Sequence, residues 1–472
     1  MLNNFIPKKI QNVHMIAICG TGMGALACML RDLGLNVSGS DQNVYPPMST
    51  FLADKGIPVL QGFLPEHLDN SPDLIIVGNT VSRNNPQVKR MCANNLPCCS
   101  MPQAIQHFFG NRKILLVTGT HGKTTTASLL AWILYTAQQD PSYFIGGIVQ
   151  NFSSNYRIGQ GQYMVIEGDE YDTAFFDKSP KFLHYQPSQT ILTGIEFDHA
   201  DIYRDLSHVK ESFAKLVQGL SQDSTLVAYG ANKNVQELIA DCPCSCETYG
   251  GKDTMWQIQS IEIAPPWTQF DTYRNNQFIH RFKTPLMGQH NLCNILSVIA
   301  VASNAGISIP DIAQGLISFK GIKRRQEIRG VVNGITVMDD FAHHPTAVLE
   351  TLSAVKPFYP NGRIIAVFEP RTNSSRRRVF QNIYPDAFGP ADIVCVRQAP
   401  LLDKIAEHDR FSSQELVKDL KKKGQQAYFF ETTDQIIAFI LKTAQSNDLV
   451  IIMSNGGFDN IHERLLTQLS DK

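Results

Sequence analysis

The sequence lacks any apolar run that approaches the roughly 18 residues of a membrane-spanning helix. Its first residues, MLNNFIPKKIQNVH, also lack the continuous apolar core of a signal peptide. We therefore expect no membrane contact and a cytoplasmic location. In that compartment the ten cysteines are expected to be reduced thiols.

An excess of charge of one sign is missing as well. The 42 Lys and Arg residues nearly balance the 43 Asp and Glu residues, and the formal net charge is −1. Short basic clusters are scattered along the chain, at residues 8–9, 376–378 and 421–423. They are too short for a nucleic-acid surface. Nucleic acid is therefore not an expected partner, and nothing in the sequence indicates a protein partner.

Three closely spaced cysteines, in Cys242-Pro243-Cys244-Ser245-Cys246, raise the question of a metal site. Spacing by a single residue is unlike that of the usual zinc sites. A plain loop is the favoured interpretation, with a metal site as the alternative.

The length of 472 residues, with 43% hydrophobic and 18% charged residues, fits a globular chain of about three domains. Apolar strands alternate with helix-like segments, which predicts doubly wound parallel sheets of the α/β class. We place the domains at residues 1–111, 112–320 and 321–472, and we expect a less regular stretch at about 223–284. Strands are expected at His14–Cys19, Leu74–Val77, Ile114–Val117, Tyr163–Ile166, Thr190–Thr193, Ile335–Met338, Ile364–Phe368, Ile393–Val396 and Leu449–Met453; helices at Leu26–Leu33, Ser412–Lys423 and Asp434–Ala444.

Residues 113–126, KILLVTGTHGKTTT, combine an apolar strand, a glycine turn and a helix-like start. Glycines let backbone N–H groups approach phosphate oxygens, and the unpaired first-turn N–H groups of a helix attract an anion. Lys123 would add its charge to the terminal phosphates, and a threonine hydroxyl would reach Mg²⁺. Gly119 and Gly122 enclose two residues, where the common pattern has four before Gly-Lys. The flanking strand and helix still predict a nucleoside triphosphate site; the alternative is a glycine-rich turn with an exposed lysine.

A second glycine-rich turn, GTGMGA, follows the first predicted strand. Gly20, Gly22 and Gly24, with Asp41 about 20 residues after the turn, match the dinucleotide-binding pattern. A nicotinamide-dependent oxidoreductase is therefore a remote alternative, which leaves residues 113–126 unexplained.

Polar clusters follow several predicted strands, where ligand loops of α/β proteins lie. The acids of Glu167-Gly168-Asp169-Glu170-Tyr171-Asp172 predict a Mg²⁺ site, with a solvated turn as the alternative. His199 lies in Glu196-Phe197-Asp198-His199-Ala200-Asp201. Asn291 and Asn294 are one helical turn apart and suit either a base edge or helix capping. Residues 323–325 and 339–345 bring charges to the start of the third domain, where surface ion pairs are the alternative.

Taken together, these segments resemble the Mur ligase family, the ATP-dependent amide-forming enzymes of peptidoglycan assembly. The resemblance spans nearly the whole chain, and its motifs are, in order, GTHGKTTT, EGDEYD, EFDHAD, GQHNLCN, KRRQEIRG and DDFAHHPT. Finer segments are similar to the murein peptide ligase subgroup, which joins L-alanyl-γ-D-glutamyl-meso-diaminopimelate to UDP-N-acetylmuramate in murein recycling; they are NVYPPMSTFL, EYDTAFFDKSPKF, EFDHADIY and MSNGGF. The N-terminal GTGMGALA and SGSD resemble the subgroup that adds L-alanine, so UDP-N-acetylmuramate–L-alanine ligation is the alternative activity.

The resemblance implies a Rossmann-like N-terminal domain, a central P-loop-type ATPase domain and a Rossmann-like C-terminal domain. It also implies ATP and Mg²⁺ as cofactors, and UDP-N-acetylmuramate and a murein tripeptide as substrates. The implied catalytic residues are Lys123, Glu170 and His199, and the implied metal ligands are Thr124, Glu170 and His199. The implied ATP contacts are Gly119, Thr120, His121, Gly122, Lys123, Thr124, Thr125, Asn291, Asn294, Arg325, Asp340 and His343. His344 is as good a candidate as His343 for the last of these contacts. The implied contacts to the UDP substrate are Gly20, Thr21, Gly22, Met23, Gly24 and Asp41.

One departure concerns the carbamoylated lysine of several family members. Ala214 stands at that position and Lys215 is its neighbour, so Lys215 is given no metal role. The residues that select the peptide and the base that deprotonates its amine stay open. Arg371, in a loop that is expected to bind ligand, suits a peptide carboxylate, and a surface arginine is the alternative.

Overall fold

The computed structural model describes residues 2–44, 46, 48–200 and 202–471. Asp201 of the predicted acidic cluster lies outside the described residues, as do Tyr45 and Pro47 of the segment Asn43–Leu52. The chain forms two compact units. The first comprises Met1–Glu196, Ser207–Gln257 and Leu296–Ser318, and the second comprises Phe197–Leu206, Ile258–Ile295 and Phe319–Lys472. No helix among the described residues has the length and apolar character that crossing a membrane requires.

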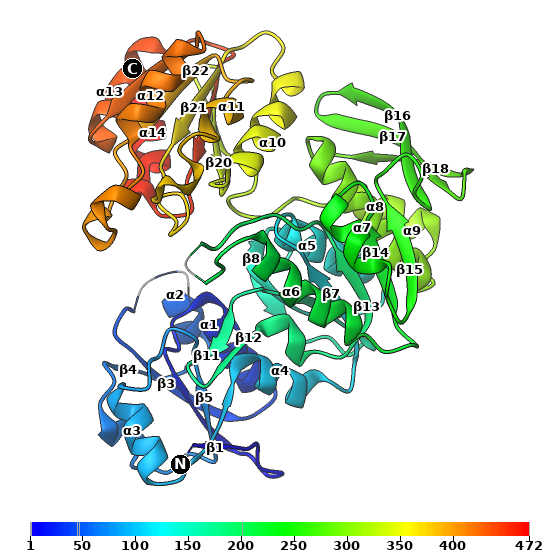
Figure 1. Ribbon diagram of the computed structural model, residues 1–472, viewed down its shortest axis with the longest axis vertical. Coiled ribbons are helices and arrows are strands. Elements are labelled where there is room, and N and C mark those ends of the chain that lie inside the picture. Colours follow the sequence, from blue (N-terminus) through cyan, green and yellow to red (C-terminus); the bar gives the residue numbers. More distant parts are fainter. Residues whose placement is uncertain (1, 45, 47, 201, 472) are drawn as a thin grey trace. The chain divides into compact units, whose positions relative to one another are not determined.

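The first unit begins with a six-stranded parallel sheet in the order β1-β6-β5-β2-β3-β4 (Figure 1). The chain runs outward in one direction from β2 and in the other from β5, so the turn after β2 lies at a topological switch point, where ligands bind in such sheets. The strands are β1 (Asn3–Asn4), β2 (Asn12–Ile16), β3 (Asn36–Asp41), β4 (Val59–Gln61), β5 (Leu74–Val77) and β6 (Pro97–Ser100), and the helices are α1 (Thr21–Asp32), α2 (Met48–Asp54), α3 (Pro86–Ala93) and α4 (Met101–Phe109).

A second sheet of this unit carries the Gly-Lys segment. Seven neighbouring strands lie in the order β15-β14-β13-β7-β10-β8-β9, and they are parallel except for β9. β7 is flanked by β13 and β10, so the predicted phosphate loop leaves an interior strand. The strands are β7 (Lys113–Thr118), β8 (Ser142–Val149), β9 (Ser154–Arg157), β10 (Tyr163–Glu167), β13 (Pro187–Leu192), β14 (Thr225–Tyr229) and β15 (Ser245–Tyr249). The helices are α5 (Lys123–Thr136), α6 (Leu206–Gln218), α7 (Lys233–Ile239) and α9 (Ile309–Ser318), and a hairpin is formed by β11 (Asp172–Ala174) and β12 (Asp177–Pro180).

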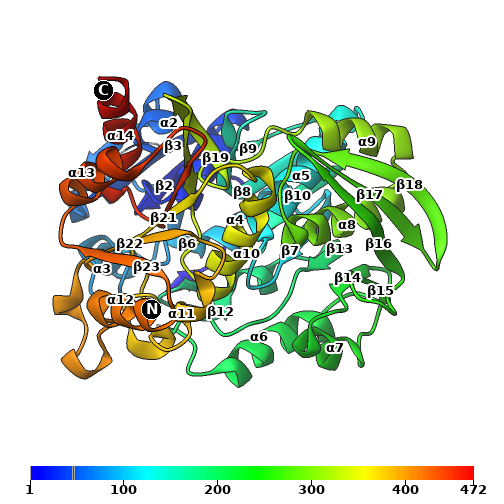
Figure 2. The same ribbon diagram turned by 90° about the horizontal axis from the view of Figure 1, so that it is seen from above.

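The second unit contains a six-stranded sheet in the order β19-β20-β24-β21-β22-β23, with β19 antiparallel to β20 and the other pairs parallel. Figure 2 labels β19, β21, β22 and β23 of this sheet. Both faces are covered, because alternate residues of β21 belong to two different apolar clusters: Ile364, Ala366 and Phe368 to one, Ile365 and Val367 to the other. The strands are β19 (Glu327–Val332), β20 (Ile335–Asp340), β21 (Ile364–Phe368), β22 (Ile393–Arg397), β23 (Gln426–Phe430) and β24 (Leu449–Met453). The helices are α10 (Pro345–Val355), α11 (Tyr384–Ala387), α12 (Ser413–Lys422), α13 (Thr433–Thr443) and α14 (Ile461–Ser470).

The bounds of several buried strands were predicted correctly from continuous apolar runs. The strands predicted at Leu74–Val77, Ile364–Phe368 and Leu449–Met453 coincide with β5, β21 and β24. The first predicted strand was wrong in extent, because Ala17 adopts φ 67°, which ends β2 at Ile16. Helix α1 starts at Thr21, earlier than the predicted Leu26.

The expectation of a less regular stretch at about 223–284 was wrong. Besides β14, α7 and β15, it contains β16 (Trp256–Ala264), β17 (Trp267–Arg274) and β18 (Gln277–Thr284). Helix α8 (Gln289–Asn304) follows the stretch. Pro265 and Pro266 lie in the turn between β16 and β17. Only one face of β17 is buried, at Thr268, Phe270 and Thr272. Because two of these three residues are threonines, the sequence does not show a clear alternation of apolar and polar residues.

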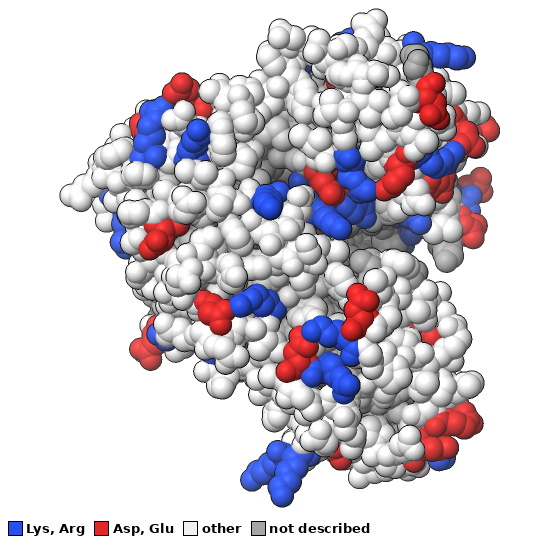
Figure 3. Space-filling view, turned by 180° about the vertical axis from the view of Figure 1, so that it is seen from behind, with Lys and Arg blue, Asp and Glu red and all other residues white. Residues whose placement is uncertain are grey.

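Basic and acidic side chains are interspersed over the face drawn in Figure 3.

His14 lies in a buried polar network of the first sheet. Its Nδ1 and Nε2 atoms lie 3.0 Å and 3.4 Å from the Ser38 and Ser40 hydroxyls, and Ser40 donates to Gln87 Oε1 at 2.6 Å. Burial, and next the charge of His67, lower the pKa of His14 to about 4. The folded protein therefore holds this imidazole neutral.

This predicts acid sensitivity of the fold. Because the folded-state pKa lies below the unfolded value of about 6.5, the stabilisation is complete above pH 6.5 and is lost as pH falls toward 4. The loss amounts to about 3 kcal/mol. It is measured as the difference in denaturation midpoint between pH 7 and pH 4.5 for the wild type and for His14→Gln, which removes the titration. His408→Gln, at an exposed position, is the matched control. An identical pH dependence in wild type and His14→Gln would contradict the interpretation.

Candidate functional site

The turn between β7 and α5 has the backbone of an anion-binding loop. Gly119 has φ 128° and Gly122 has φ 80°, both in the region that favours glycine. Gly122 is the N-cap of the 14-residue helix α5 and provides no side-chain hydrogen bond to it. The first-turn N–H groups of α5 thus face a ligand position with the positive end of the helix dipole.

Position 119 also requires glycine because another backbone segment passes close to it and leaves no space for a side chain. A Cβ at this position would lie 2.3 Å from Thr193 Oγ1 and 2.9 Å from the Gly194 carbonyl. That neighbouring segment is fixed by backbone bonds, since Thr193 N donates to Thr118 O and Thr120 N donates to Gly194 O, each at 2.9 Å. The loop is therefore held between the ends of β7 and β13.

Lys123 points back into the loop, and its side chain is only 13% exposed. Its ammonium donates to the carbonyls of Gly119 at 2.7 Å and Thr120 at 3.1 Å, and to Glu170 Oε1 at 2.9 Å. Burial lowers the pKa of Lys123, but the charge and hydrogen bond of Glu170, with Asp169 and Glu167, outweigh it and raise the pKa above its usual value. The lysine is therefore fully charged, and Glu170 is its principal counter-charge.

The acidic segment after β10 divides into separate pairs. Thr124 Oγ1 donates to Glu167 Oε1 at 2.8 Å, and Gly146 N donates to Glu167 Oε2 at 2.7 Å. Burial is the main cause that raises the pKa of Glu167. Asp169 forms an ion pair with Lys181, which outweighs burial and lowers the pKa of Asp169. The carboxylate beside the Thr124 hydroxyl is thus Glu167, which belongs to the predicted acidic segment but was not among the predicted metal ligands.

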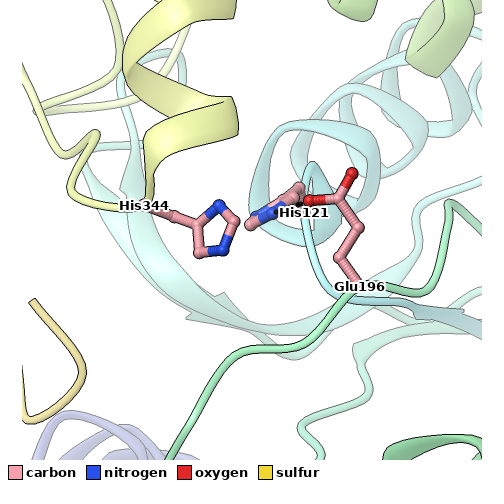
Figure 4. Close-up of side chains that lie close together, drawn as sticks. All are labelled: His121, Glu196 and His344. Atoms are coloured by element: carbon pink, nitrogen blue, oxygen red, sulfur yellow. Dashed lines mark hydrogen bonds and ion pairs between the residues drawn. The ribbon is translucent and has the colours of Figure 1, made fainter. Parts of the chain in front are cut away.

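His121 lies on the same loop and pairs with Glu196, at 3.3 Å between Nε2 and Oε2 (Figure 4). Thr120 fixes the backbone of that segment, because Glu196 N donates to Thr120 Oγ1 at 2.9 Å. The third side chain labelled in Figure 4, His344, belongs to the second unit. There its Nδ1 accepts from Thr346 N at 3.2 Å as the N-cap of α10, and its Nε2 lies 3.2 Å from the Phe197 carbonyl oxygen.

In the second unit Asp198 is buried among histidines. Nε2 of His199 and Nε2 of His343 each lie 4.0 Å from Asp198 Oδ2. Burial raises the pKa of Asp198, but His199, then His343 and His344, outweigh it and hold the pKa well below its usual range. His199 has φ 55° in the left-handed region. This conformation in a non-glycine residue marks a position under local constraint.

The second unit also brings the predicted nucleotide residues of two distant segments together. Asn291 Nδ2 lies 3.4 Å from Gln326 Oε1, and Gln326 N donates to Asp340 Oδ2 at 2.8 Å. Burial raises the pKa of Asp340, and Arg325 is the main opposing charge. The Arg325 guanidinium lies 4.8 Å from the centre of the Phe341 ring. Asn294 is buried one turn along α8. Gln326 was missed from sequence, because a single glutamine carries no pattern.

The N-terminal glycine turn is placed at the start of α1. Gly20 is its N-cap without a side-chain bond, and Gly24 approaches α2 so closely that a Cβ would lie 2.9 Å from Met48 Cε. Asp41 is buried, and its carboxylate accepts from Cys19 N at 2.9 Å and from Asn43 N at 3.0 Å. Asp41 therefore holds the glycine turn against the end of β3.

A cavity of about 270 Å³ opens at the carboxyl edge of this sheet. Its lining comes from the segments after β3, β4 and β5, which sequence patterns did not indicate because none contains a recognisable motif. The lining residues are Gln42, Phe63, Thr80, Val81, Ser82, Asn84, Asn85 and Pro86.

Charged groups gather at the carboxyl ends of β21, β22 and β24. Glu369 is fully buried, accepts from Arg397 at 2.6 Å and from Ser454 Oγ at 2.7 Å, and lies 3.6 Å from Arg371. Arg397 also donates to Asp459 at 2.8 Å. Arg371 is 37% exposed, so one guanidinium of this cluster is accessible. Lys215, which was given no metal role, is exposed on α6.

Comparison with known proteins assigns each part of the chain to one family. Family models match residues 12–113 (Mur ligase family, catalytic domain), 117–302 (Mur ligase middle domain) and 324–456 (Mur ligase, glutamate ligase domain). The UDP-N-acetylmuramate–L-alanyl-γ-D-glutamyl-meso-2,6-diaminoheptandioate ligase of Haemophilus influenzae is 38% identical over 98% of this chain and 100% of that protein. The ligase of the same name from Escherichia coli is 39% identical over 98% of both.

Among solved structures, a murein peptide ligase from Psychrobacter arcticus matches with a TM-score of 0.71 and 33% identity, over 98% of this chain and 99% of that one. The predicted α/β class and three-domain architecture are thereby confirmed. The boundaries at 111/112 and 320/321 and the roles of the individual site residues stay predictions.

The backbone of the loop gives a stability prediction. Gly119→Ala would combine an unfavourable φ with a collision against Thr193 and Gly194, so we expect a loss of roughly 2–4 kcal/mol. Gly306→Ala is the matched control, since Gly306 has φ 80° with open space around its Cβ position, and only about 1 kcal/mol is expected there. Thermal unfolding of the two variants measures the difference; equal losses would show that close approach does not constrain the loop.

Proposed function

This chain belongs to the Mur ligase family, and we propose that it is an ATP-dependent amide ligase that joins L-alanyl-γ-D-glutamyl-meso-diaminopimelate to UDP-N-acetylmuramate. The observation that carries the proposal is the loop 119–126, in which helix N–H groups and a buried, charged Lys123 converge. The end-to-end similarity to two ligases of that name supports the choice of substrates. Because this peptide is a recovered fragment of murein, the proposed reaction belongs to murein recycling, and the proposed location is the cytoplasm.

The first unit would hold the triphosphate. Residues Gly119 to Thr125 supply backbone N–H groups and hydroxyls, and Lys123 would exchange its Glu170 partner for the β and γ oxygens of ATP. His121 lies on the same loop and is positioned by Glu196.

Mg²⁺, when bound, would neutralise charge between the phosphates and the carboxylates. Thr124 is a suitable ligand, and its hydrogen-bonded neighbour Glu167 fits the same ion. Glu170 was the carboxylate predicted from sequence, and its pairing with Lys123 favours a role in setting that charge. His199 is proposed for a second ion, with buried Asp198 orienting its ring.

The second unit would hold the nucleoside. Asn291 and Asn294 suit the adenine edge, Asp340 the ribose and Arg325 the phosphates. Of the two adjacent histidines, His343 is the proposed contact and His344 the alternative, and the ring nitrogens of both have partners within the protein. The UDP part would bind at the start of α1, over Gly20, Thr21, Gly22, Met23 and Gly24. The uridine would occupy the adjacent cavity, which is lined by Gln42, the residue after Asp41.

The proposed chemistry proceeds through an acyl phosphate. The lactyl carboxylate of UDP-N-acetylmuramate attacks the γ-phosphorus of ATP, and Lys123 offsets the repulsion between these anions. The α-amine of the peptide then attacks the mixed anhydride and expels phosphate. Arg371, held beside buried Glu369, is proposed to bind a carboxylate of the peptide, and no residue is assigned as the base.

Lys123→Ala should lower turnover by at least about 1,000-fold, because it removes the charge that meets the triphosphate. Binding of UDP-N-acetylmuramate, measured by calorimetry, should change less than about twofold, since that substrate is proposed to bind at another sheet. Lys422→Ala is the control at an exposed lysine. Near-normal turnover of Lys123→Ala would refute the phosphate role.

The two carboxylates can be separated by Mg²⁺ titration in the presence of ADP. Glu167→Gln should weaken Mg²⁺ binding at least about tenfold, because it removes a charged oxygen next to Thr124. Glu170→Gln should act mainly by leaving Lys123 without its counter-charge, and so lower the melting temperature. A larger loss of Mg²⁺ affinity in Glu170→Gln than in Glu167→Gln would restore the assignment made from sequence.

Acceptor choice is checked by phosphate release with UDP-N-acetylmuramate and either the tripeptide or free L-alanine. The tripeptide should support a rate at least about tenfold higher, and Arg371→Ala should raise its KM while Arg378→Ala, at an exposed arginine, leaves it unchanged. A preference for L-alanine would identify the alternative ligase activity.

A further inference from the structure

Three cysteines of the first unit occupy alternate positions where the turn after α7 leads into β15. Cys242, Cys244 and Cys246 are each half-buried, while Asp241, Pro243 and Ser245 between and before them are exposed. The sulfur atoms of Cys242 and Cys244 lie 3.4 Å apart. Two of the three thiols are therefore already in contact, and the exposed residues around them leave the segment open to small reagents.

The segment lies away from the proposed ligand sites of the same sheet. Cys242 N donates to Ile239 O at 3.1 Å in the turn after α7, and Cys246 is the second residue of β15. Since β15, β14, β13 and β7 are mutually parallel, the start of β15 lies at the amino edge of the sheet. The Gly-Lys loop follows the carboxyl end of β7, so the cysteines take no part in the nucleotide site.

The arrangement suits a bond between two sulfurs better than a metal ion. Among the described residues, no group of three potential metal-ligand atoms within 4.8 Å of one another includes a cysteine. A disulfide needs its sulfurs at about 2.05 Å, so rotation about the side-chain bonds has to bring the two sulfurs closer together.

We propose that Cys242 and Cys244 are a redox site that forms a reversible disulfide by exchange with a low-molecular-mass disulfide such as oxidised glutathione. One cysteine thiolate attacks a glutathione sulfur, which breaks the glutathione disulfide and releases one glutathione thiolate. The second cysteine thiolate then attacks the mixed disulfide and releases the other glutathione. Both cysteines are oxidised, two glutathione thiols are produced, and the two cysteine protons end on them or in solvent.

The environment sets the rate of this exchange. Burial raises the pKa of the Cys242 thiol to about 11 and that of Cys246 to about 12. Only a small fraction of the Cys242 thiol is ionised at neutral pH, so its attack on a disulfide is slow there and accelerates as pH rises.

The test uses the full chain, folded, with oxidised glutathione at pH 8.5, followed by iodoacetamide and trypsin. Mass spectrometry of the peptide 234–252, which contains these three cysteines, should find Cys242 linked to Cys244 and one alkylated cysteine, Cys246. Dithiothreitol before alkylation should restore three alkylated cysteines. Alkylation of all three after oxidation, or a bond that includes Cys246, would overturn the proposal.

Variants give an independent check. Cys246→Ser should still form the disulfide, whereas Cys242→Ser should stop at a glutathione adduct on Cys244. Cys293, also half-buried but on α8, should remain alkylated throughout as the internal control for accessibility. A disulfide between Cys244 and Cys246 in the Cys242→Ser protein would contradict the assigned pairing. The experiment needs neither ATP nor UDP-N-acetylmuramate, so its outcome is independent of the proposed ligase activity.

Discussion

The loop between β7 and α5 depends on a buried ion pair. Lys123 and Glu170 lie 2.8 Å apart, and the two side chains are 13% and 3% exposed. Removing both charges from water is costly, and mutual attraction with added hydrogen bonds to Gly119 and Thr120 offsets that cost. The pair keeps a full positive charge at the N-terminus of α5, ready for an anion. Phosphate oxygens are the natural replacement for the carboxylate, which connects the packing of this loop to the proposed chemistry.

Parallel sheets explain how candidate ligand groups that are far apart in the sequence come to lie at one edge of a sheet. In each sheet the polar segments follow strands: the glycine turn follows β2, the Gly-Lys loop follows β7, the acids follow β10, and the Glu369 cluster follows β21. The carboxyl ends of neighbouring parallel strands meet at one edge, so residues far apart in sequence become neighbours. The same geometry assigns the three clustered cysteines to the opposite edge of their sheet.

Patterns with a strong local cause were predictable. Continuous apolar runs located β5, β21 and β24, because strands buried on both faces need no polar residue. The Gly-Lys loop was predictable because its backbone requires glycine at 119 and 122. Pairings that depend on tertiary packing were not. The contact of Glu167 with Thr124, the link from Asn291 through Gln326 to Asp340, and the cavity beside β3 join segments with no shared motif. Strands β16 to β18 were not predicted, because threonine and other polar residues weaken the alternation of apolar and polar positions that indicates a strand.

The most direct measurement is a crystal structure of the protein grown with Mg²⁺ and a non-hydrolysable ATP analogue. The account predicts the triphosphate over residues 119–125, with the Lys123 ammonium within hydrogen-bond distance of a β or γ oxygen. A nucleotide bound at the Gly20–Gly24 turn, with the loop after β7 unchanged and Lys123 still paired only with Glu170, would contradict it.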